Sequence, residues 1–162
     1  MPPRRKFRRP LGEKRYRKMF VIATEGAKTE PEYFSILQQI VGNVTVKIKC
    51  LTRDKESAPE LVLKRMKKHI HDEGLKDEDE AWLVVDRDYW TNEQLAQLYN
   101  WSKEHDSYGL AVSNPNFELW LLFHFDEASG ITNAKNCSRH DWPRTTGTTV
   151  YRLVERIFQS TG

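Results

Sequence analysis

Seven consecutive residues decide how this chain folds: Trp82-Leu83-Val84-Val85-Asp86-Arg87-Asp88. An apolar run bounded by charged residues is typical of a buried strand. Asp86 and Asp88 follow where that strand leaves the sheet, and side chains two residues apart in an extended chain point to the same side. Carboxylate oxygens are the ligands that Mg²⁺ and Mn²⁺ prefer. The stretch therefore predicts a cation site at the end of a buried strand.

A second acidic strand end lies near the start of the chain. The apolar run 19–24 leads directly into Glu25-Gly26, and Gly26 suits a sharp turn with no side chain to block a metal or a phosphate. A lone D-x-D motif is more often part of a loop, a turn or a helix cap than of a metal site. With Glu25 added, the acids indicate metal-assisted phosphoryl chemistry, in which cations neutralise developing charge and lower the pKa of bound water. Glu25, Asp86 and Asp88 are the candidate catalytic and metal-binding residues, with Mg²⁺ or Mn²⁺ as cofactor.

Strand and helix patterns alternate along the chain. We expect strands over 19–24, 44–51, 81–85 and 108–112. We expect helices over 30–40, from 57 to about 74, from 91 to about 101, over 114–125 and over 150–159, with capping boxes at Thr29–Glu32, Ser57–Glu60 and Thr91–Gln94. This order predicts an α/β, Rossmann-like fold: a mostly parallel four-stranded sheet with helices on both faces. Ligands of such sheets bind outside the carboxyl ends of the strands, where the three acids fall.

Composition limits the class of protein. The 162 residues, 38% of them hydrophobic, fit one domain with an ordinary core. No apolar stretch approaches the roughly 20 residues that cross a bilayer, so we expect no membrane association. Two cysteines, Cys50 and Cys137, are too few for a disulfide framework, and the N-terminus carries no apolar signal region. We therefore expect a cytoplasmic protein.

Charge is distributed unevenly. Residues 1–18 hold nine Lys or Arg against one acid, a charge of +8, so the net charge of +3 leaves −5 for residues 19–162. We interpret 1–18 as a basic arm without fixed structure and 19–162 as a single domain. Basic arms bind nucleic acid by neutralising phosphates and releasing counterions. A solubilising tail, or a tail that docks on an acidic partner, is the alternative.

Several other residues are candidates for binding. Lys28 lies near a helix N-terminus, where a phosphate can sit, and is our first choice for a substrate-contacting base. Glu118 starts an apolar helix, where it either contacts metal or substrate, or pairs with the helix dipole or a core arginine. Asn114 and Asn116 are candidate helix caps as well as substrate contacts, and His124 either hydrogen-bonds in the core or transfers protons. Arg87, between the two aspartates, is a further substrate-binding candidate.

Patterns elsewhere favour structural roles. The helix over 30–40 should place Tyr33, Phe34, Leu37 and Ile40 inward. The basic residues Lys64, Arg65, Lys67 and Lys68 form a solvent face, with nucleic-acid contact as the alternative. Because the histidines show no ligand spacing, we place four on the surface: His69, His71, His105 and His140. The tryptophans Trp90, Trp101 and Trp142 either pack or stack on bases.

Three ordered motifs resemble the RloB-like family, over about residues 19–160. They are Glu25-Gly26-Ala27-Lys28-Thr29-Glu30-Pro31-Glu32-Tyr33-Phe34, Val85-Asp86-Arg87-Asp88, and Asn114-Pro115-Asn116-Phe117-Glu118-Leu119-Trp120 with His124-Phe125. A glutamate after the first strand and D-x-D after a later one also match Toprim, the metal-binding α/β domain of topoisomerases, primases and overcoming-lysogenization-defect nucleases. The resemblance implies a Toprim-like fold, with Glu25 as catalytic acid or metal ligand and Asp86 and Asp88 as metal ligands.

The resemblance also implies a biological setting. RloB-like proteins are encoded beside restriction or abortive-infection loci and are regarded as Toprim-type nucleases, some acting with an ABC-type ATPase that senses phage. A nuclease of anti-phage defence, acting on RNA or DNA with an ATPase partner, is thus implied. The chain has no P-loop motif, so ATPase activity would belong to that partner. The lysine that follows D-x-D in overcoming-lysogenization-defect nucleases has no counterpart here, so double-strand cleavage is not implied.

Two other functions stay open. The chain is alternatively a non-catalytic Toprim-like module that binds nucleic acid or an ATPase, which its short length and the missing lysine would suit. A primase-like or nucleotidyl-transferring enzyme ranks below both, because the chain has no recognisable nucleotide-binding segment. The sequence does not decide between RNA and DNA and does not give the oligomeric state.

Overall fold

The computed structural model describes residues 17–41, 46–52, 58–87, 90–114, 117–122 and 150–160. Its strands are β1 (Lys18–Thr24), β2 (Val46–Leu51), β3 (Glu80–Asp86) and β4 (Tyr108–Ser113). Its helices are α1 (Thr29–Val41), α2 (Pro59–Glu73), α3 (Asn92–Ser102), α4 (Phe117–Leu122) and α5 (Val150–Gln159). The alternating order confirms the predicted α/β class.

The four strands form one sheet in the order β2-β1-β3-β4, and every neighbouring pair is parallel. The central strands carry the most apolar runs, and Phe20 to Ala23 and Leu83 to Val85 are almost wholly inaccessible to solvent. β2 is an edge strand, as its alternating lysines predict: Lys47 and Lys49 occupy positions that a central strand would fill with apolar side chains.

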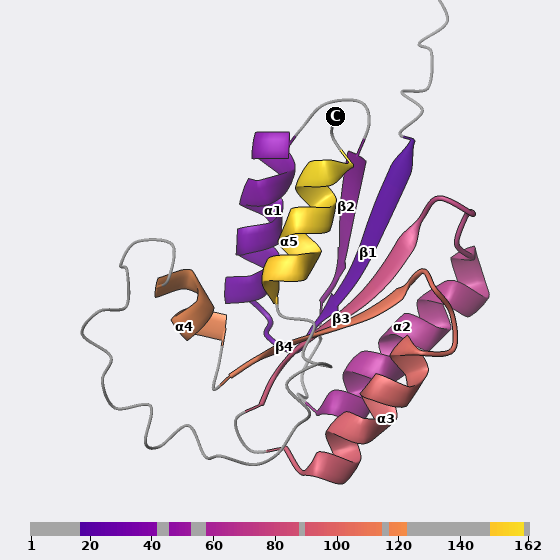
Figure 1. The fold of residues 1–162 in the computed structure, drawn as a ribbon, viewed down its shortest axis with the longest axis vertical. Helices are drawn as coiled ribbons and strands as arrows, with labels where there is room; N and C mark the ends of the chain where they lie inside the picture. Colours follow the sequence, from indigo (N-terminus) through magenta and orange to yellow (C-terminus); the bar gives the residue numbers. More distant parts are fainter. Residues whose placement is uncertain are drawn as a thin grey trace, which may run out of the picture.

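Helices cover both faces of the sheet, as predicted (Figure 1). Side chains that alternate along the strands divide the core into two layers. One layer joins the sheet to α2 and α3 through Val62, Leu63, Met66, Leu95, Leu98 and Trp101. The other joins it to α1, α4 and α5 through Phe34, Leu37, Val41, Phe117, Leu153 and Ile157.

The direction of the connections reverses between β1 and β3. The chain leaves β1 towards β2 by way of α1, whereas the connections from β2 to β3 and from β3 to β4 run the other way through α2 and α3 on the opposite face. Crossovers of constant hand require helices on opposite faces when the direction changes. The carboxyl ends of β1 and β3 therefore flank the switch point, where open α/β sheets bind ligands.

The structure confirms some of the predicted helix ends and contradicts one predicted cap. The Thr91–Gln94 capping box is present, and Gly74 ends α2 with φ of 71°. The predicted Ser57 cap is wrong, because α2 has Ala58 at its N-cap, where no side chain caps the helix, and Pro59 in its first turn. Proline in the first turn removes one of the backbone N–H groups that have no intrahelical partner, and its fixed φ suits the start of a helix.

Two hydrophobic or titratable side chains on the helices lie where the sequence did not place them, Ile40 and His69. Ile40 is 69% exposed, because α1 packs through Phe34, Leu37 and Val41. His69 is buried rather than on the surface, because it continues the buried row of Val62 and Met66 on α2. Burial, with the nearby charge of Lys49, lowers the pKa of His69, so its imidazole is neutral at pH 7.

Several predictions fall outside the described residues. They are the disorder of the basic arm up to residue 16, the continuation of α4 through residue 125, the loop over 128–147, and the placement of His140 and Trp142. The described residues include no helix that is long and apolar enough to span a membrane.

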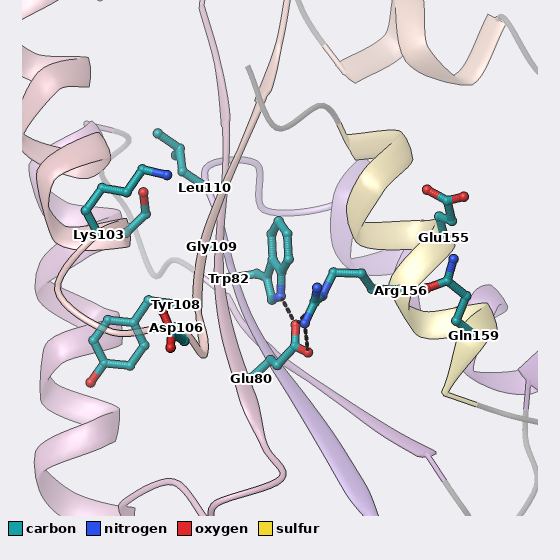
Figure 2. A pocket seen from close by; sticks show the side chains of 11 residues that line it. Glu80, Trp82, Lys103, Asp106, Tyr108, Gly109, Leu110, Glu155, Arg156 and Gln159 are labelled. Atoms are coloured by element: carbon teal, nitrogen blue, oxygen red, sulfur yellow. Dashed lines mark hydrogen bonds and ion pairs between the residues drawn. The ribbon is translucent and has the colours of Figure 1, made fainter. Parts of the chain in front are cut away.

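Glu80 ties three segments together at the amino end of the sheet. Its buried carboxylate accepts hydrogen bonds from Trp82 Nε1 (2.9 Å) and from Arg156 Nε and Nη2 of α5 (2.9 and 2.5 Å), and Lys18 Nζ of β1 lies 2.7 Å away. Figure 2 shows the Trp82 and Arg156 contacts in a cavity of about 330 Å³. A buried carboxylate with these donors keeps its charge. Burial raises the pKa of Glu80, but the bonds from Arg156, Lys18 and Trp82 outweigh it and hold this pKa below its usual range.

Candidate functional site

Glu25 and Asp86 meet at the carboxyl edge of the sheet. Parallel pairing of β1 with β3 brings Thr24 opposite Val84, and the backbone N–H of Glu25 donates to the Val84 carbonyl at 3.0 Å. The backbone N–H of Asp86 in turn donates to Glu25 Oε2 at 3.0 Å. Residues 61 positions apart therefore lie together at the switch point, the place that the strand pattern indicated.

The Glu25 carboxylate holds both ends of the loop from β3 to α3. Its Oε2 accepts from Asp86 at the start of that loop, and its Oε1 accepts from the indole Nε1 of Trp90 at the end, at 2.9 Å. The N–H of Trp90 also donates to the Arg87 carbonyl at 3.1 Å. Glu25 is thus a fixed carboxylate, since both its oxygens accept hydrogen bonds.

A glycine and a buried acid shape the turn after β1. Gly26 N–H donates to Glu30 Oε1 at 2.9 Å, and Thr24 Oγ1 donates to the Gly26 carbonyl at 3.0 Å. A Cβ on Gly26 would lie 1.7 Å from Glu30 Oε2. The Glu30 carboxylate therefore fills the space beside Gly26, where the sequence predicts room for a metal or a phosphate, and Glu30 is only 5% exposed.

Gly26→Ala should lower the free energy of unfolding by about 1.5–3 kcal/mol, because the new Cβ expels the Glu30 carboxylate and breaks its hydrogen bond to the backbone. Urea denaturation of Gly26→Ala, Glu30→Ala and the double variant measures the effect. The double variant should be scarcely less stable than Glu30→Ala alone, since no carboxylate is left to clash. Losses that simply add would show that the two residues do not interact as described.

Arg65 brings a positive charge to this edge. Its Nη2 donates to the carbonyl of Thr24 at 2.7 Å, one peptide bond from Glu25. The sequence placed Arg65 on a solvent face, but it is half-buried, because α2 crosses from β2 over β1 and points Arg65 at the end of that strand. Its contact is with the protein backbone.

Ser113 adds a buried hydroxyl. It ends β4 in register with Asp86, is 5% exposed, and its carbonyl accepts from Arg87 N–H at 2.8 Å. Its Oγ has no hydrogen-bond partner among the described residues. Buried hydroxyls are normally satisfied, so a bound water or a hydrated cation beside Asp86 would complete this group.

Three other candidates lie in the segments that follow β1, β3 and β4. Lys28 is exposed just before α1, and Asn114 is exposed just after β4. Arg87 is turned towards the start of α3, where its Nη2 donates to Asn92 Oδ1 at 3.1 Å. Glu118 belongs to α4, but its side chain lies outside the described residues, as do Asp88, Asn116 and His124.

The described carboxylates are the right type of ligand for a hard cation, but there are too few of them to complete a metal site. Glu25 and Asp86 are both carboxylates, the oxygen ligands that Mg²⁺ and Mn²⁺ take. Within the described ranges no group of three or more His, Cys, Asp or Glu could hold a metal ion. A complete centre therefore needs Asp88, the predicted third ligand, or waters around the cation.

Thiolate chemistry has no support in the described residues. Cys50 lies on edge strand β2, and burial raises its pKa to about 12. The thiol therefore stays protonated at neutral pH, and protonated thiols are poor nucleophiles and poor metal ligands.

Sequence reasoning missed three residues of this edge. The sequence predicts packing or base stacking for Trp90, whereas its indole N–H donates to Glu25, 65 residues earlier in the chain. The sequence predicts Glu30 as the start of a helix, and its position five residues after Glu25 is the signal that could have linked it to this edge. Ser113 carries no signal in the sequence, because its position beside Asp86 follows from strand register.

Comparison with known proteins gives one result. Neither the curated proteins nor the solved structures include one with significant similarity to the chain. The family model of RloB-like protein matches residues 20–142, which include most of β1, all of β2 to β4 and the Glu25–Asp86 edge. The chain belongs to the RloB-like protein family.

Proposed function

We propose that this protein is a Mg²⁺- or Mn²⁺-dependent nuclease that hydrolyses phosphodiester bonds of RNA or DNA. The observation that carries the proposal is the meeting of Glu25 and Asp86 at the switch point of an all-parallel sheet. Bringing two carboxylates to a ligand-binding edge costs free energy unless a cation or hydrogen-bond donors balance their negative charge. The family and the D-x-D motif support the same assignment.

Each residue has a distinct role in this proposal. Asp86 and Asp88 would hold the cation, and Glu25, fixed by two hydrogen bonds, would bind it or orient the attacking water. The cation supplies charge neutralisation at the phosphate and a more acidic bound water. Glu118 is a further candidate ligand.

Positive groups would bind the nucleic acid. Lys28 is exposed at the start of α1, where the unpaired N–H groups of the helix favour a phosphate. The guanidinium of Arg65, which donates to the Thr24 carbonyl, makes the electrostatic potential near Glu25 more positive. The basic arm would add contacts to the phosphate backbone that weaken as salt concentration rises.

A cleavage screen tests the proposal. The full chain is incubated with single- and double-stranded RNA and DNA, in Mg²⁺, in Mn²⁺ and in EDTA. We expect cleavage of at least one substrate class with a divalent metal and none in EDTA. Cleavage that survives EDTA, or no cleavage of any substrate with either metal, would contradict the nuclease assignment.

One observation favours a second candidate, a non-catalytic module. Both Glu25 oxygens already accept hydrogen bonds from the protein, and the described residues lack a three-ligand cluster. In that case the basic arm would hold nucleic acid while the domain docks an ATPase. Metal-independent binding of an oligonucleotide, with no cleavage under any metal, would support this candidate.

The setting proposed for the nuclease is prokaryotic anti-phage defence, with an ABC-type ATPase as partner. This part of the proposal comes from membership of the RloB-like family. Co-purification of the two proteins from one host, with and without phage infection, tests it.

A further inference from the structure

The indole of Trp90 contacts both Glu25 and the core layer under α2 and α3. Its N–H donates to Glu25 Oε1 at 2.9 Å, and its ring packs, partly buried, against the core layer under α2 and α3. The next residue, Thr91, is the N-cap of α3 in a complete capping box. The indole N–H is therefore held in place by its own helix and not by Glu25 alone.

α3 is itself tied to α2. Gln94 completes the capping box through its backbone N–H and side-chain oxygen, and its Nε2 donates to Glu60 Oε1 at 3.0 Å. Hydrogen bonds thus tie the start of α3 to α2, and the peptide bond between Thr91 and Trp90 connects the indole to this anchored helix start. An indole held in this way can fix the direction of the Glu25 carboxylate without any contact to substrate.

We propose that Trp90 is a positioning residue that orients the Glu25 carboxylate for cation binding. The inference rests on the proposed function, which it deepens by adding a residue outside the acidic motifs. Each carboxylate oxygen has a second lone pair, so a bond from Trp90 leaves Glu25 able to take a further partner. Ligating carboxylates in proteins are commonly hydrogen-bonded in this way, and loss of such a partner lowers metal affinity about 10- to 100-fold.

Trp90→Phe separates the N–H from the ring, because it keeps an aromatic side chain in the core layer. Mn²⁺ affinity of the full chain, measured by calorimetry, should fall at least about 10-fold. Trp82→Phe is the matched control: it removes an indole N–H that donates to Glu80 at 2.9 Å, at the opposite end of the sheet (Figure 2). This control should leave Mn²⁺ affinity unchanged.

A second readout needs no metal. In ¹⁵N-labelled protein, Glu25→Gln should shift the indole N–H signal of Trp90 and leave that of Trp82 in place. Wild-type Mn²⁺ affinity in Trp90→Phe, or an unmoved Trp90 signal in Glu25→Gln, would overturn the positioning role. If the wild type binds no Mn²⁺, the proposed metal function itself fails, and this result is distinct from wild-type and Trp90→Phe proteins that bind alike.

Discussion

Asp86→Ala should reduce metal-dependent phosphodiester cleavage at least about 100-fold. Loss of even an indirect partner of a metal ligand costs about 10- to 100-fold, and Asp86 is proposed as a direct ligand. The contact between Asp86 and Glu25 uses the backbone N–H of Asp86, which alanine retains. The expected loss of cleavage would therefore result from removal of the Asp86 carboxylate and not from displacement of Glu25. Initial cleavage rates over a range of Mg²⁺ and Mn²⁺ concentrations measure it.

Asp77→Ala is the matched control for this experiment. Asp77 is an exposed acid between α2 and β3, and its removal changes the net charge by the same amount. The Asp77→Ala variant should cleave nucleic acid at the wild-type rate. Equal rates for Asp86→Ala and wild type, at metal concentrations below saturation, would remove Asp86 from the catalytic site.

Glu80→Ala should be strongly destabilising, by about 2–4 kcal/mol. Breaking a buried ion pair costs about 3–5 kcal/mol because the remaining charge is left unpaired, and we reduce that figure because the Arg156 side chain is about half exposed. The variant leaves Lys18, Arg156 and Trp82 without their shared acceptor. Urea denaturation measures the change, and Glu78→Ala, an exposed acid two residues away, should have almost no effect.

The same carboxylate makes stability depend on pH. The pKa of Glu80 is lower in the folded protein than its ordinary value of 4.5, so its contribution is complete above that value. It should be lost as pH falls below about 4.5 towards the folded-state pKa. The pH profile of the unfolding free energy should therefore be flatter in Glu80→Ala than in the wild type below pH 5. Parallel profiles would show that Glu80 does not carry this linkage.

The sequence predicted the elements of the fold well, because the signals for them are local. Apolar runs predicted three strands, the alternation of apolar and polar residues over 44–51 predicted the fourth, and the Thr91–Gln94 spacing predicted a helix start; the structure confirms all of these. Burial on a helix was harder to predict. Whether Arg65, His69 or Ile40 faces the protein depends on where its helix crosses the sheet. That position follows from strand order, which local sequence patterns do not determine.

The candidate site was only partly predictable for a related reason. Glu25 and Asp86 were expected together because both end parallel strands, and they are in contact. Nothing local indicates that β1 and β3 are neighbours across a reversal of direction, or that Trp90 reaches back to Glu25. The roles of Asp88, Glu118, Asn116 and His124 stay predictions, since their side chains lie outside the described residues.

Paramagnetic broadening by Mn²⁺ tests most directly whether a cation binds at this edge. In ¹⁵N-labelled protein, substoichiometric Mn²⁺ should first broaden the amide signals of Gly26, Arg87 and Asn114, at the carboxyl ends of β1, β3 and β4. Signals of Ala81 and Gly109, roughly 13–17 Å away along the strands, should broaden much less, and Asp86→Ala should abolish the selectivity. Broadening centred on the amino end, or spread evenly over the protein, would contradict a cation site formed by Glu25 and Asp86.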